Sequence, residues 1–590
     1  MSIVRLGKIH LHWCESCNLP IVEKNSCGIC GSTPKKVKIT PPGDVRPAFE
    51  EDVKLIKKTI DRQWGTDYSK KVLSRERPVL LNGIPYEDRM DEVIIDGQVI
   101  GAIRYNPSRK LDGKEPYEFI LRPWKGLDTP KKNYVIVDEG AVEPILNGGS
   151  VLNPGIIEAD PEIKEGEEII VSDKNGKILC SGRSKLPGKE LVNSSSGRGV
   201  KNRWRVSDFS PTKKEKSWDE VVEANKSILK NKENESVKFV EKHIDEHDIP
   251  VAVAYSGGKD SLATLHILLK SKAQPDILFI DTGIELPETI ENVYEIAEKY
   301  NLTLHEKKAE SGYWKNVEYF GPSARDYRWC CKTCKLGPTS LLIKEKYDDG
   351  VLSFIGQRRY ESRQRMSHGS TWDNPWVPGQ VSASPIQDWT ALHIWLYLFW
   401  KDADWNIWYE DGFERIGCWV CPASNLSEFD KLKDEFDEYD RFEDVLQNYA
   451  EKNDLPQEWV ELGLWRWINI PENMEKHFQD FERKADPNPS KIIDETKKEL
   501  LKDERSKNLL NAYSDSVEDL SRDDILVQHK KALNCVECGV CVAQCEKGAL
   551  SFDDGIKIDE KRCVHCESCL GKCPVVDFDS RVNDQSASKI

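Results

Sequence analysis

Long apolar runs are missing from this sequence, and no stretch approaches the roughly 20 residues that a membrane-spanning helix needs. The first residues, MSIVRLGKIHLHWC, also lack the apolar stretch and the small-residue cleavage site of a signal peptide. A positive net charge is missing as well, because the formal net charge is −16 at pH 7. These absences argue against a membrane protein, a secreted protein and wholesale binding to a polyanion, and they predict a cytoplasmic protein.

Cysteine is abundant instead, with 18 residues that fall mainly into tight clusters in a chain of 590 residues. A chain of this length predicts several domains. Disulfide frameworks belong to small secreted proteins, whereas CxxC clusters in a cytosolic chain indicate metal centres, here in a reducing, anaerobic host. Cys180 stands alone in a strand pattern, which predicts a small buried side chain.

Residues 14–30 read CESCNLPIVEKNSCGIC, in which two CxxC pairs offer four thiolates to one tetrahedral ion. The spacing predicts a zinc ribbon over residues 1–45, with zinc bound by Cys14, Cys17, Cys27 and Cys30. Iron in a rubredoxin-like site is the alternative, because both metals accept four thiolates. Residues 46–128 show mixed helix and strand patterns without a catalytic motif and stay unassigned.

From residue 129 to residue 206, short strand patterns alternate with Gly and Asp turns. The segment NGGSVLNPGI within this stretch resembles a PUA domain, a small β-barrel, and the resemblance implies RNA as a partner. A basic stripe follows, and it could track phosphates or simply form a solvated face. Its members are Lys185, Lys189, Arg198, Lys201, Arg203, Arg205, Lys213, Lys214 and Lys216. Residues 207–248 are predicted to form a helical linker.

The stretch IPVAVAYSGGKDSLATLHILL (249–269) reads as a strand, a Gly-rich turn and a helix. Glycines allow close backbone approach to a phosphate, and a helix N-terminus presents free N–H groups to it. The loop is not a Walker motif, and it resembles the SGGxDS loop of the PP-loop nucleotide-binding superfamily. The predicted nucleotide-binding residues are Ser256, Gly257, Gly258, Lys259, Asp260 and Ser261.

Alternating strand and helix patterns continue beyond this loop, which predicts a parallel sheet with helices on both faces. Ligands bind at the carboxyl ends of such strands. We therefore expect Asp281, Thr282, Gly283 and Glu285 to line the nucleotide pocket. Arg358, Arg359, Arg363 and Arg365 form a cluster that suits phosphate or sulfate, with a surface ion-pair face as the alternative.

Two cysteine motifs, RWCCKTCK and GCWVC, lie in the same region. The order SGGKDS, DTGxxxPET, CC, GxRRxES, PxxDW and CxxC resembles the phosphoadenosine phosphosulfate (PAPS) reductase family, in particular its iron–sulfur branch. The resemblance implies a PP-loop (adenine nucleotide alpha hydrolase-like) catalytic domain over residues 249–428. It also implies one [4Fe–4S] cluster on Cys330, Cys331, Cys418 and Cys421, and a lysine at Lys335 that couples cluster and substrate.

Two departures from the family pattern affect the mechanism. Cys334 stands where the family has arginine, and the ECGLH motif that supplies a nucleophilic cysteine is missing. Cys538 in the similar stretch VECGV is better explained as a ferredoxin ligand. Cys334 is therefore the candidate nucleophile, and direct reduction without a covalent intermediate is equally open. The predicted catalytic residues are Lys335, Cys334, Arg358 and Arg359, with Arg363 binding substrate.

Near the end of the chain, the pattern C-x2-C-x2-C-x3-C occurs twice, as in bacterial ferredoxins. In such runs the fourth cysteine of each block binds the other cluster. The first [4Fe–4S] cluster is expected on Cys535, Cys538, Cys541 and Cys573, and the second on Cys563, Cys566, Cys569 and Cys545. Residues 525–580 are therefore a 2[4Fe–4S] ferredoxin domain, which brings the expected cofactors to three [4Fe–4S] clusters and zinc.

The remaining segments are predicted from their patterns. Residues 429–524 show helical periodicity and form a helical spacer, in which the aromatic stretch WVELGLWRWINI serves core or interface packing. Residues 581–590 are predicted to be disordered.

The predicted fold is thus a multidomain α/β protein, and the favoured function is a PAPS or APS reductase of sulfate assimilation. Sulfite and an adenosine phosphate would be made with electrons from the fused ferredoxin domain, which an external donor reduces. The alternative is an iron–sulfur tRNA-sulfurating enzyme that binds RNA through the PUA-like domain. A non-enzymatic electron carrier leaves the nucleotide loop unexplained. No membrane partner is expected, and a homo-oligomer stays open.

Overall fold

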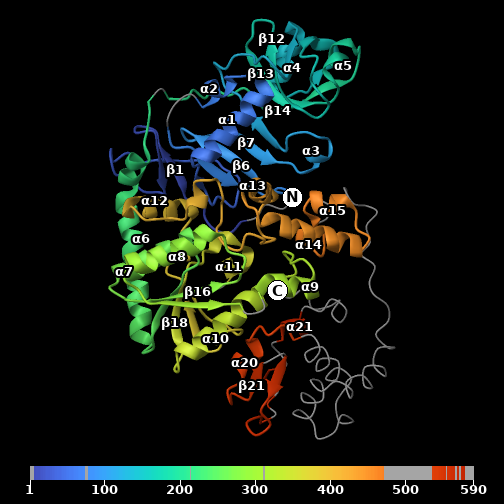
Figure 1. Cartoon of the computed structure of the whole chain (residues 1–590). Helices are drawn as coiled ribbons and strands as arrows, with labels where there is room; N and C mark the ends of the chain where they lie inside the picture. Colours follow the sequence, from blue (N-terminus) through green and yellow to red (C-terminus); the bar gives the residue numbers. More distant parts are fainter. Residues whose placement is uncertain are drawn as a thin grey trace. The chain divides into compact units, whose positions relative to one another are not determined.

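The computed structural model describes residues 5–73, 77–212, 214–309, 312–367, 369–470, 535–552, 555–564, 566, 568–569 and 573–577 (Figure 1). Among these residues, no helix has both the length and the apolar character needed to cross a membrane. Lys213, residues 471–524 of the predicted spacer and the predicted tail 581–590 lie outside the described residues.

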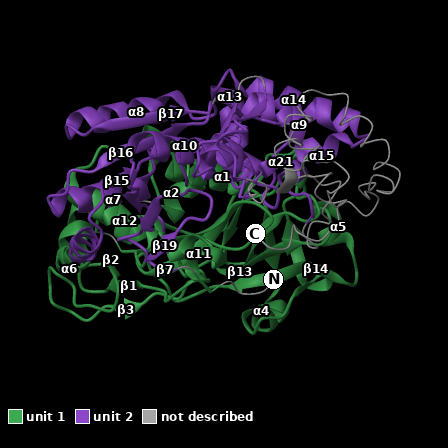
Figure 2. Ribbon diagram, turned by 90° about the horizontal axis from the view of Figure 1, so that it is seen from below, with its two compact units in different colours: residues 1–235, 358–367, 388–414 green, residues 236–357, 368–387, 415–590 purple. Residues whose placement is uncertain are grey.

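The chain divides into two compact units (Figure 2). Unit 1 consists of residues 1–235, 358–367 and 388–414, and unit 2 of residues 236–357, 368–387 and 415–590. The predicted catalytic segment 249–428 therefore contributes residues to both units.

Unit 1 begins with a three-stranded antiparallel sheet that carries the first cysteine cluster. Its strands are β1 (Leu11–Cys14), β2 (Leu19–Val22) and β3 (Lys35–Lys36). The buried side chain of Asn225 fixes this sheet, because it accepts a hydrogen bond from the Val22 N–H and donates one to the Pro20 carbonyl, both at 2.9 Å. Asn225 belongs to the long helix α6 (Trp218–Glu246).

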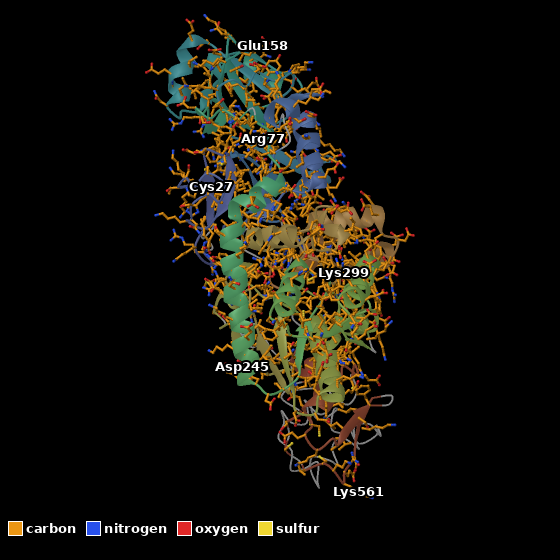
Figure 3. All side chains as sticks on the ribbon, turned by 90° about the vertical axis from the view of Figure 1, so that its left-hand side faces the viewer. Cys27, Arg77, Glu158, Asp245, Lys299 and Lys561 are labelled. Atoms are coloured by element: carbon orange, nitrogen blue, oxygen red, sulfur yellow. The ribbon has the colours of Figure 1, made fainter. Side chains whose placement is uncertain are left out.

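A five-stranded antiparallel sheet follows in unit 1, where the sequence carries no recognisable motif. Helix α1 (Glu50–Trp64) buries Ile56, Ile60 and Trp64, which lie four residues apart and so share one face of the helix. A buried ion pair of 2.6 Å joins Arg77 (labelled in Figure 3) to Asp96 in this region. The strands are β4 (Arg46–Pro47), β5 (Leu80–Gly83), β6 (Met90–Ile95), β7 (Gln98–Tyr105) and β8 (Tyr117–Leu121).

The PUA-like part of unit 1 is a six-stranded sheet in the order β10-β14-β13-β12-β9-β11. Cys180 on β13 is fully buried in its core, which confirms the predicted small core side chain. Its elements are β9 (Tyr134–Val137), α4 (Glu139–Leu146), β10 (Val151–Leu152), β11 (Ile156–Ala159), β12 (Glu168–Asp173), β13 (Ile178–Ser184), α5 (Gly188–Asn193) and β14 (Arg198–Arg205).

Unit 2 contains the predicted nucleotide-binding sheet, in the order β17-β16-β15-β18-β20-β19. Five strands are parallel, and the short edge strand β19 is antiparallel, so the sheet is not purely parallel as the sequence alone suggests. The strands are β15 (Val251–Ala254), β16 (Asp276–Asp281), β17 (Leu304–Lys308), β18 (Val351–Ile355), β19 (Thr371–Asp373) and β20 (Gln380–Ala383).

Helices alternate with the parallel strands, as the sequence predicts. They are α7 (Lys259–Lys270), α8 (Pro287–Lys299), α9 (Gly312–Phe320) and α10 (Gly337–Lys346). Lys299, labelled in Figure 3, is the last residue of α8, where a cation complements the negative end of the helix dipole. The strand order reverses between β15 and β18, and ligands of doubly wound sheets bind outside the carboxyl ends of the strands at this place.

Short helices and the ferredoxin segment complete the described part of unit 2. In the first group, Trp465 packs its ring at 5.2 Å from Phe429 and 5.1 Å from Phe442, which confirms packing as the role of this aromatic stretch. The helices are α13 (Leu426–Glu435), α14 (Tyr439–Lys452) and α15 (Gln457–Glu461). The ferredoxin segment contains α20 (Val540–Gln544), β21 (Leu550–Phe552), β22 (Ile556–Ile558) and α21 (Pro574–Asp577).

Candidate active site

The Gly-rich loop connects the end of β15 to the start of α7. Gly257 has φ +71°, which glycine adopts without steric cost, and Gly258 is the N-cap of α7. No side chain caps this helix, and the N-terminus of a helix is the end that favours a bound anion. The Ser261 hydroxyl donates a 2.8 Å hydrogen bond to the Gly258 carbonyl and fixes the turn. We call the turn Ser256–Gly258 and the first turn of α7 the phosphate cradle, because the sequence predicts that they bind phosphate.

Lys259, at the start of α7, is almost fully buried, and its ammonium group lies 2.9 Å from the carboxylate of Asp260. The carboxylate holds the ammonium group within the first turn of the helix and offsets its charge. The sequence prediction of these two residues as nucleotide ligands stays a prediction.

Gly356, just beyond β18, lies against the first turn of α7. A β-carbon at this position would be only 2.5 Å from the backbone nitrogen of Ser261 and from the carbonyl carbon of Asp260. Neither atom can move without shifting the phosphate cradle. The segment that follows β18 therefore packs directly on the segment that follows β15, at the switch point of the sheet.

Replacing Gly356 by alanine is expected to weaken AMP binding by at least roughly tenfold, because the added methyl group displaces the backbone of the cradle. Calorimetric titration of oxygen-free protein with AMP measures the effect. Gly369→Ala is the matched control, because the nearest atom to its β-carbon would be 3.5 Å away. Equal AMP affinity in the two variants would contradict the assignment of the cradle.

The loop after β16 links the predicted nucleotide pocket to the central cysteines. The Asp281 carboxylate accepts a 2.8 Å hydrogen bond from the Gly283 N–H, and the Thr282 hydroxyl donates to the Glu285 carboxylate. The Cys418 sulfur lies 3.7 Å from the Thr282 hydroxyl and 3.6 Å from Glu285 Oε1. The Asp281–Glu285 loop and Cys418 are therefore in direct contact.

The adjacent cysteines lie at the start of an unusually wide helical turn. A π-helix spans Cys331–Leu336, with Cys330 as its N-cap. Single π-turns are rare and often mark functional sites. The charges of Cys331, Cys418 and Cys421 all act on Cys330, so the four sulfur atoms share one small region. The structure thus brings together the four cysteines that the family resemblance assigns to one cluster.

The environment of these thiols favours negative charge at one of them. A hydrogen bond from Cys330 and then the positive charges of Arg328 and Lys335 lower the pKa of Cys331 to about 5, despite its burial. Burial and then the charge of Glu285 raise the pKa of Cys418. The Lys335 ammonium lies 3.8 Å from Glu285, and the negative charge of Cys418 raises the pKa of Lys335. Lys335 is therefore a fixed cation beside the thiols.

Cys334 lies in the same π-turn but is more deeply buried than the four cysteines of the predicted cluster. Its side chain is 2% exposed, and its sulfur lies 3.4 Å from the Thr333 hydroxyl and 4.0 Å from the amide of Asn316. Burial raises the pKa of Cys334 to about 11, so the reactive thiolate is scarce near neutral pH. This geometry disfavours Cys334 as the nucleophile expected from the sequence.

The Cys334→Ala variant is therefore expected to keep its iron content and a rate of sulfite release within about threefold of the unmodified chain, since a buried neutral thiol is a weak nucleophile. Iron analysis and a sulfite assay on oxygen-free protein check this. Lost activity with unchanged iron would restore the nucleophilic role.

The arginine cluster that follows β18 is largely used for structure. Arg358 is 3% exposed, and its guanidinium binds both carboxylate oxygens of Asp44 at 2.9 and 3.0 Å within unit 1. Arg359 pairs with Asp388, and Arg365 pairs with Glu361. The predicted catalytic role of Arg358 is therefore not supported, because its charge is buried and neutralised. Arg363 is exposed on α11 (Arg363–Ser367), and its predicted contact with substrate stays a prediction.

Three other arginines support the cysteines, and sequence reasoning missed them. Arg325 donates to the Pro422 and Ser424 carbonyls at 2.8 and 3.2 Å, and the fully buried Arg466 donates to the Ser424 carbonyl at 3.0 Å. Arg328 forms a hydrogen bond with Cys331. Only Arg328, two residues before the cysteine pair, carries a sequence signal.

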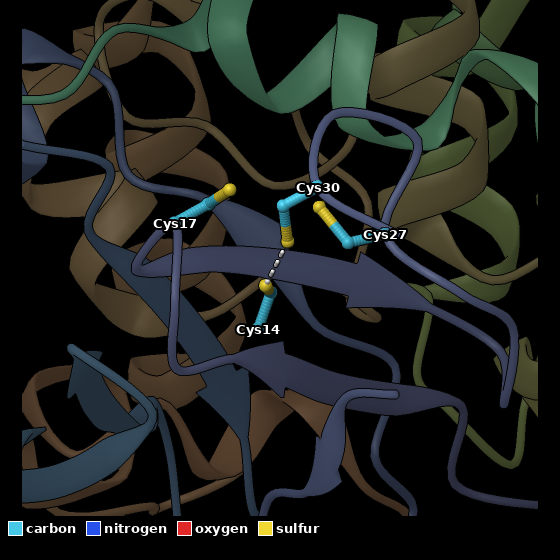
Figure 4. Close-up of side chains that lie close together, drawn as sticks. All are labelled: Cys14, Cys17, Cys27 and Cys30. Carbon is cyan, nitrogen blue, oxygen red and sulfur yellow. Dashed lines mark hydrogen bonds between the residues drawn. The ribbon is translucent and has the colours of Figure 1, made fainter. Parts of the chain in front are cut away.

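The N-terminal cysteines form a compact group (Figure 4). The sulfur atoms of Cys14, Cys17, Cys27 and Cys30 all lie within 4.8 Å of one another, and those of Cys14 and Cys30 are 3.4 Å apart. Tetrahedral Zn–S bonds of about 2.3 Å place sulfur atoms roughly 3.8 Å apart. The group is compatible with a zinc ribbon.

The ferredoxin cysteines line a cavity in unit 2. Cys535, Cys538, Cys541 and Cys573 contribute to its wall, together with Phe552 and Ile556. Cys545, Cys563 and Cys569 belong to the adjoining core around Leu550 and Ile558. The expected assignment of the two clusters to these cysteines stays a prediction.

Some side chains of the basic stripe in the PUA-like part already have partners within the protein. Arg203 pairs with Glu168 at 2.9 Å, and Arg205 donates to the Leu146 carbonyl. A surface hollow is lined by Asn202, Trp204 and Arg205, and the Trp204 side chain is 40% exposed.

Comparison with known proteins agrees with this arrangement. The model of the phosphoadenosine phosphosulfate reductase domain matches residues 250–424, the PUA domain matches residues 133–205, and the 4Fe-4S dicluster domain matches residues 534–576. The chain belongs to the PAPS reductase domain family. The resemblances to this family, to PUA domains and to dicluster ferredoxins are thereby confirmed.

Several relatives of this PAPS reductase family member are similar over different lengths. The Uncharacterized protein MJ0066 of Methanocaldococcus jannaschii is 37% identical over 476 residues, which cover 78% of this chain and 97% of the relative. The adenosine 5'-phosphosulfate reductase of Geobacillus kaustophilus is 26% identical over 190 residues, 30% of this chain and 75% of the relative. The phosphate complex of the Candida auris PAPS reductase is 18% identical, with a TM-score of 0.27, over 32% of this chain and 94% of that chain.

Proposed function

We propose that this PAPS reductase family protein reduces a sulfonucleotide, PAPS or APS, to sulfite and an adenosine phosphate. The observation that most strongly supports this proposal is the contact of the Asp281–Glu285 loop with Cys418. Through this contact the predicted nucleotide pocket adjoins a group of four thiols. Four soft thiolates are the donor set that a [4Fe–4S] cluster takes, so Cys330, Cys331, Cys418 and Cys421 fit that group. When bound, such clusters supply electrons one at a time.

The chain's own residues bind and orient the substrate. The uncapped start of α7 and the loop residues Ser256–Gly258 hold the α-phosphate, and the Asp281–Glu285 loop directs the sulfonate toward the thiols. Lys335 stabilises the negative charge that develops as the S–O bond breaks. Two electrons enter the sulfur atom, which leaves as sulfite, while the bridging oxygen stays with the nucleotide. The electron balance closes without a covalent cysteine intermediate, which suits the burial of Cys334.

A direct test supplies ³⁵S-labelled APS or PAPS and titanium(III) citrate to oxygen-free protein and measures labelled sulfite. Dithionite is avoided because its own oxidation releases sulfite. We expect labelled sulfite with one of the two nucleotides. Its absence with both, in protein that carries its full iron content, would overturn the proposal.

The second candidate is an RNA-sulfurating enzyme, favoured by the PUA domain and by the exposed Trp204 of its surface hollow. Aromatic side chains next to arginines are suited to stack and hold unpaired bases. Extraction of the purified protein for bound RNA, and mass analysis of thiolated nucleosides made in its presence, test this alternative. Bound tRNA and a thiolated product, without sulfite release, would favour it over the reductase.

A further inference from the structure

The ferredoxin segment packs on α10 in unit 2 through its first cysteine block. A β-carbon on Gly337 would lie 2.0 Å from the Cys538 carbonyl oxygen, so the two backbones touch. A β-carbon on Gly539, which has φ +79°, would lie 2.2 Å from a methyl carbon of Leu341. Glycine on each side permits this close approach.

A charged anchor lies two turns further along α10. The Lys344 ammonium donates hydrogen bonds of 2.9 Å to both the Val542 and the Cys545 carbonyl oxygens. These carbonyls belong to the C-terminal end of α20, where a cation complements the helix dipole. Leu341 and Lys344, three residues apart, lie on the same face of α10. Gly337, Leu341 and Lys344 are therefore named the docking face.

The docking face begins at the end of the central cysteine turn. Gly337 follows the π-helix Cys331–Leu336 directly and lies six positions after Cys331. At about 1.5 Å rise per residue this separation is roughly 9 Å. Cys538, which contacts Gly337, lines the ferredoxin cavity together with Cys535, Cys541 and Cys573. The two cysteine groups thus meet across one backbone contact.

The second cysteine block contains one exposed cysteine, whereas Cys563 is half-buried and Cys569 is buried. Cys566 is exposed, and the neighbouring Val564 side chain is 57% exposed. The residues of the first block, by contrast, are half-buried or buried against α10. An external protein can approach the exposed Cys566, while the first block packs on α10.

We propose that the docking face is an electron-transfer junction. It fixes the direction in which electrons pass through the ferredoxin domain. The cluster that Cys563, Cys566 and Cys569 would help to hold would accept single electrons from a low-potential protein donor near the exposed Cys566. The cluster of the first block would pass them across Gly337 to the cluster that the central cysteines would hold, and two such transfers balance the release of one sulfite. This inference rests on the proposed function for its final acceptor, but the docking and the direction of transfer are testable without it.

The test uses the full-length, cluster-loaded chain with the variants Lys344→Glu and Leu341→Glu. Each places a negative charge against the carbonyl oxygens or glycine of the ferredoxin segment. Lys346→Glu is the matched control, because Lys346 lies exposed at the end of the same helix. Two readouts are independent of turnover: hydrogen–deuterium exchange of residues 540–544, and the magnetic coupling between reduced centres in electron paramagnetic resonance spectra.

We expect both variants to exchange residues 540–544 at least tenfold faster and to lose the magnetic coupling, while Lys346→Glu behaves like the unmodified chain. Sulfite release driven by a reduced 2[4Fe–4S] ferredoxin should fall at least tenfold in both variants. Release driven by reduced methyl viologen, a small donor that can reach the central centre itself, should stay within twofold. If the exchange rates of residues 540–544 and the magnetic coupling in Lys344→Glu and Leu341→Glu equal those in Lys346→Glu, the proposed junction is wrong.

The result separates the junction from the proposed function. If no chain releases sulfite with either donor, the reductase proposal fails, and the exchange and coupling data still decide the junction. If sulfite is released equally by all chains with the protein donor, the junction fails and the reductase proposal stands.

Discussion

Replacing Cys418 by alanine is expected to abolish sulfite release and to remove one iron centre, leaving about four fewer iron atoms per chain. Cys418 contacts both Thr282 and Glu285, so its loss removes a predicted cluster ligand at the point where the cysteine group meets the predicted nucleotide loop. Iron analysis, electron paramagnetic resonance and the labelled-sulfite assay on oxygen-free protein measure the effect.

The matched control for this variant is Cys180→Ala, because Cys180 is an isolated buried cysteine in the PUA-like part of unit 1. It should keep full iron content and sulfite release. Full iron and undiminished activity in Cys418→Ala would mean that the central cysteines do not hold a centre required for the reaction.

The Lys335→Met variant is expected to lower kcat for sulfite release by about 10²- to 10³-fold, the usual effect of removing one donor that stabilises developing negative charge. The ammonium group lies 3.8 Å from Glu285, and the Cys418 charge is the main cause of its raised pKa. It therefore stays protonated throughout the neutral range. Steady-state kinetics with the preferred sulfonucleotide measure the change.

Affinity for AMP should change less than threefold in Lys335→Met, because the phosphate cradle lies on α7. Lys332→Met is the control within the same π-turn, since the Lys332 ammonium packs 3.7 Å from the centre of the Trp376 ring. Similar kcat values for the two variants would show that Lys335 has no special role in catalysis.

Much of the architecture could be predicted because its signals are local. The strand, Gly-rich turn and helix of 249–269 form β15, the loop and α7, and the two CxxC motifs of residues 14–30 form one compact thiol group. Local sequence fixes turn geometry and ligand spacing, so these features need no knowledge of distant residues. The antiparallel edge strand β19 was missed because a three-residue strand carries almost no periodicity.

The use of each charged side chain could not be predicted, because it depends on partners distant in sequence. Arg358 reads as an anion-binding residue until Asp44, 314 positions earlier, is found against its guanidinium. Arg466 supports the turn after Cys421 from a segment with no related motif. Likewise, only packing shows that Cys334 points into the core and that Lys344 holds the end of α20.

The most direct test of the central claim is a single turnover in which the chain's own stored electrons are the only reductant. Oxygen-free protein is reduced with titanium(III) citrate, freed of the reagent by gel filtration and mixed with ³⁵S-labelled APS or PAPS. The account predicts that the iron–sulfur centres reoxidise as labelled sulfite appears, with about one sulfite for every two electrons lost. Centres that stay reduced while the sulfonucleotide remains intact would contradict it.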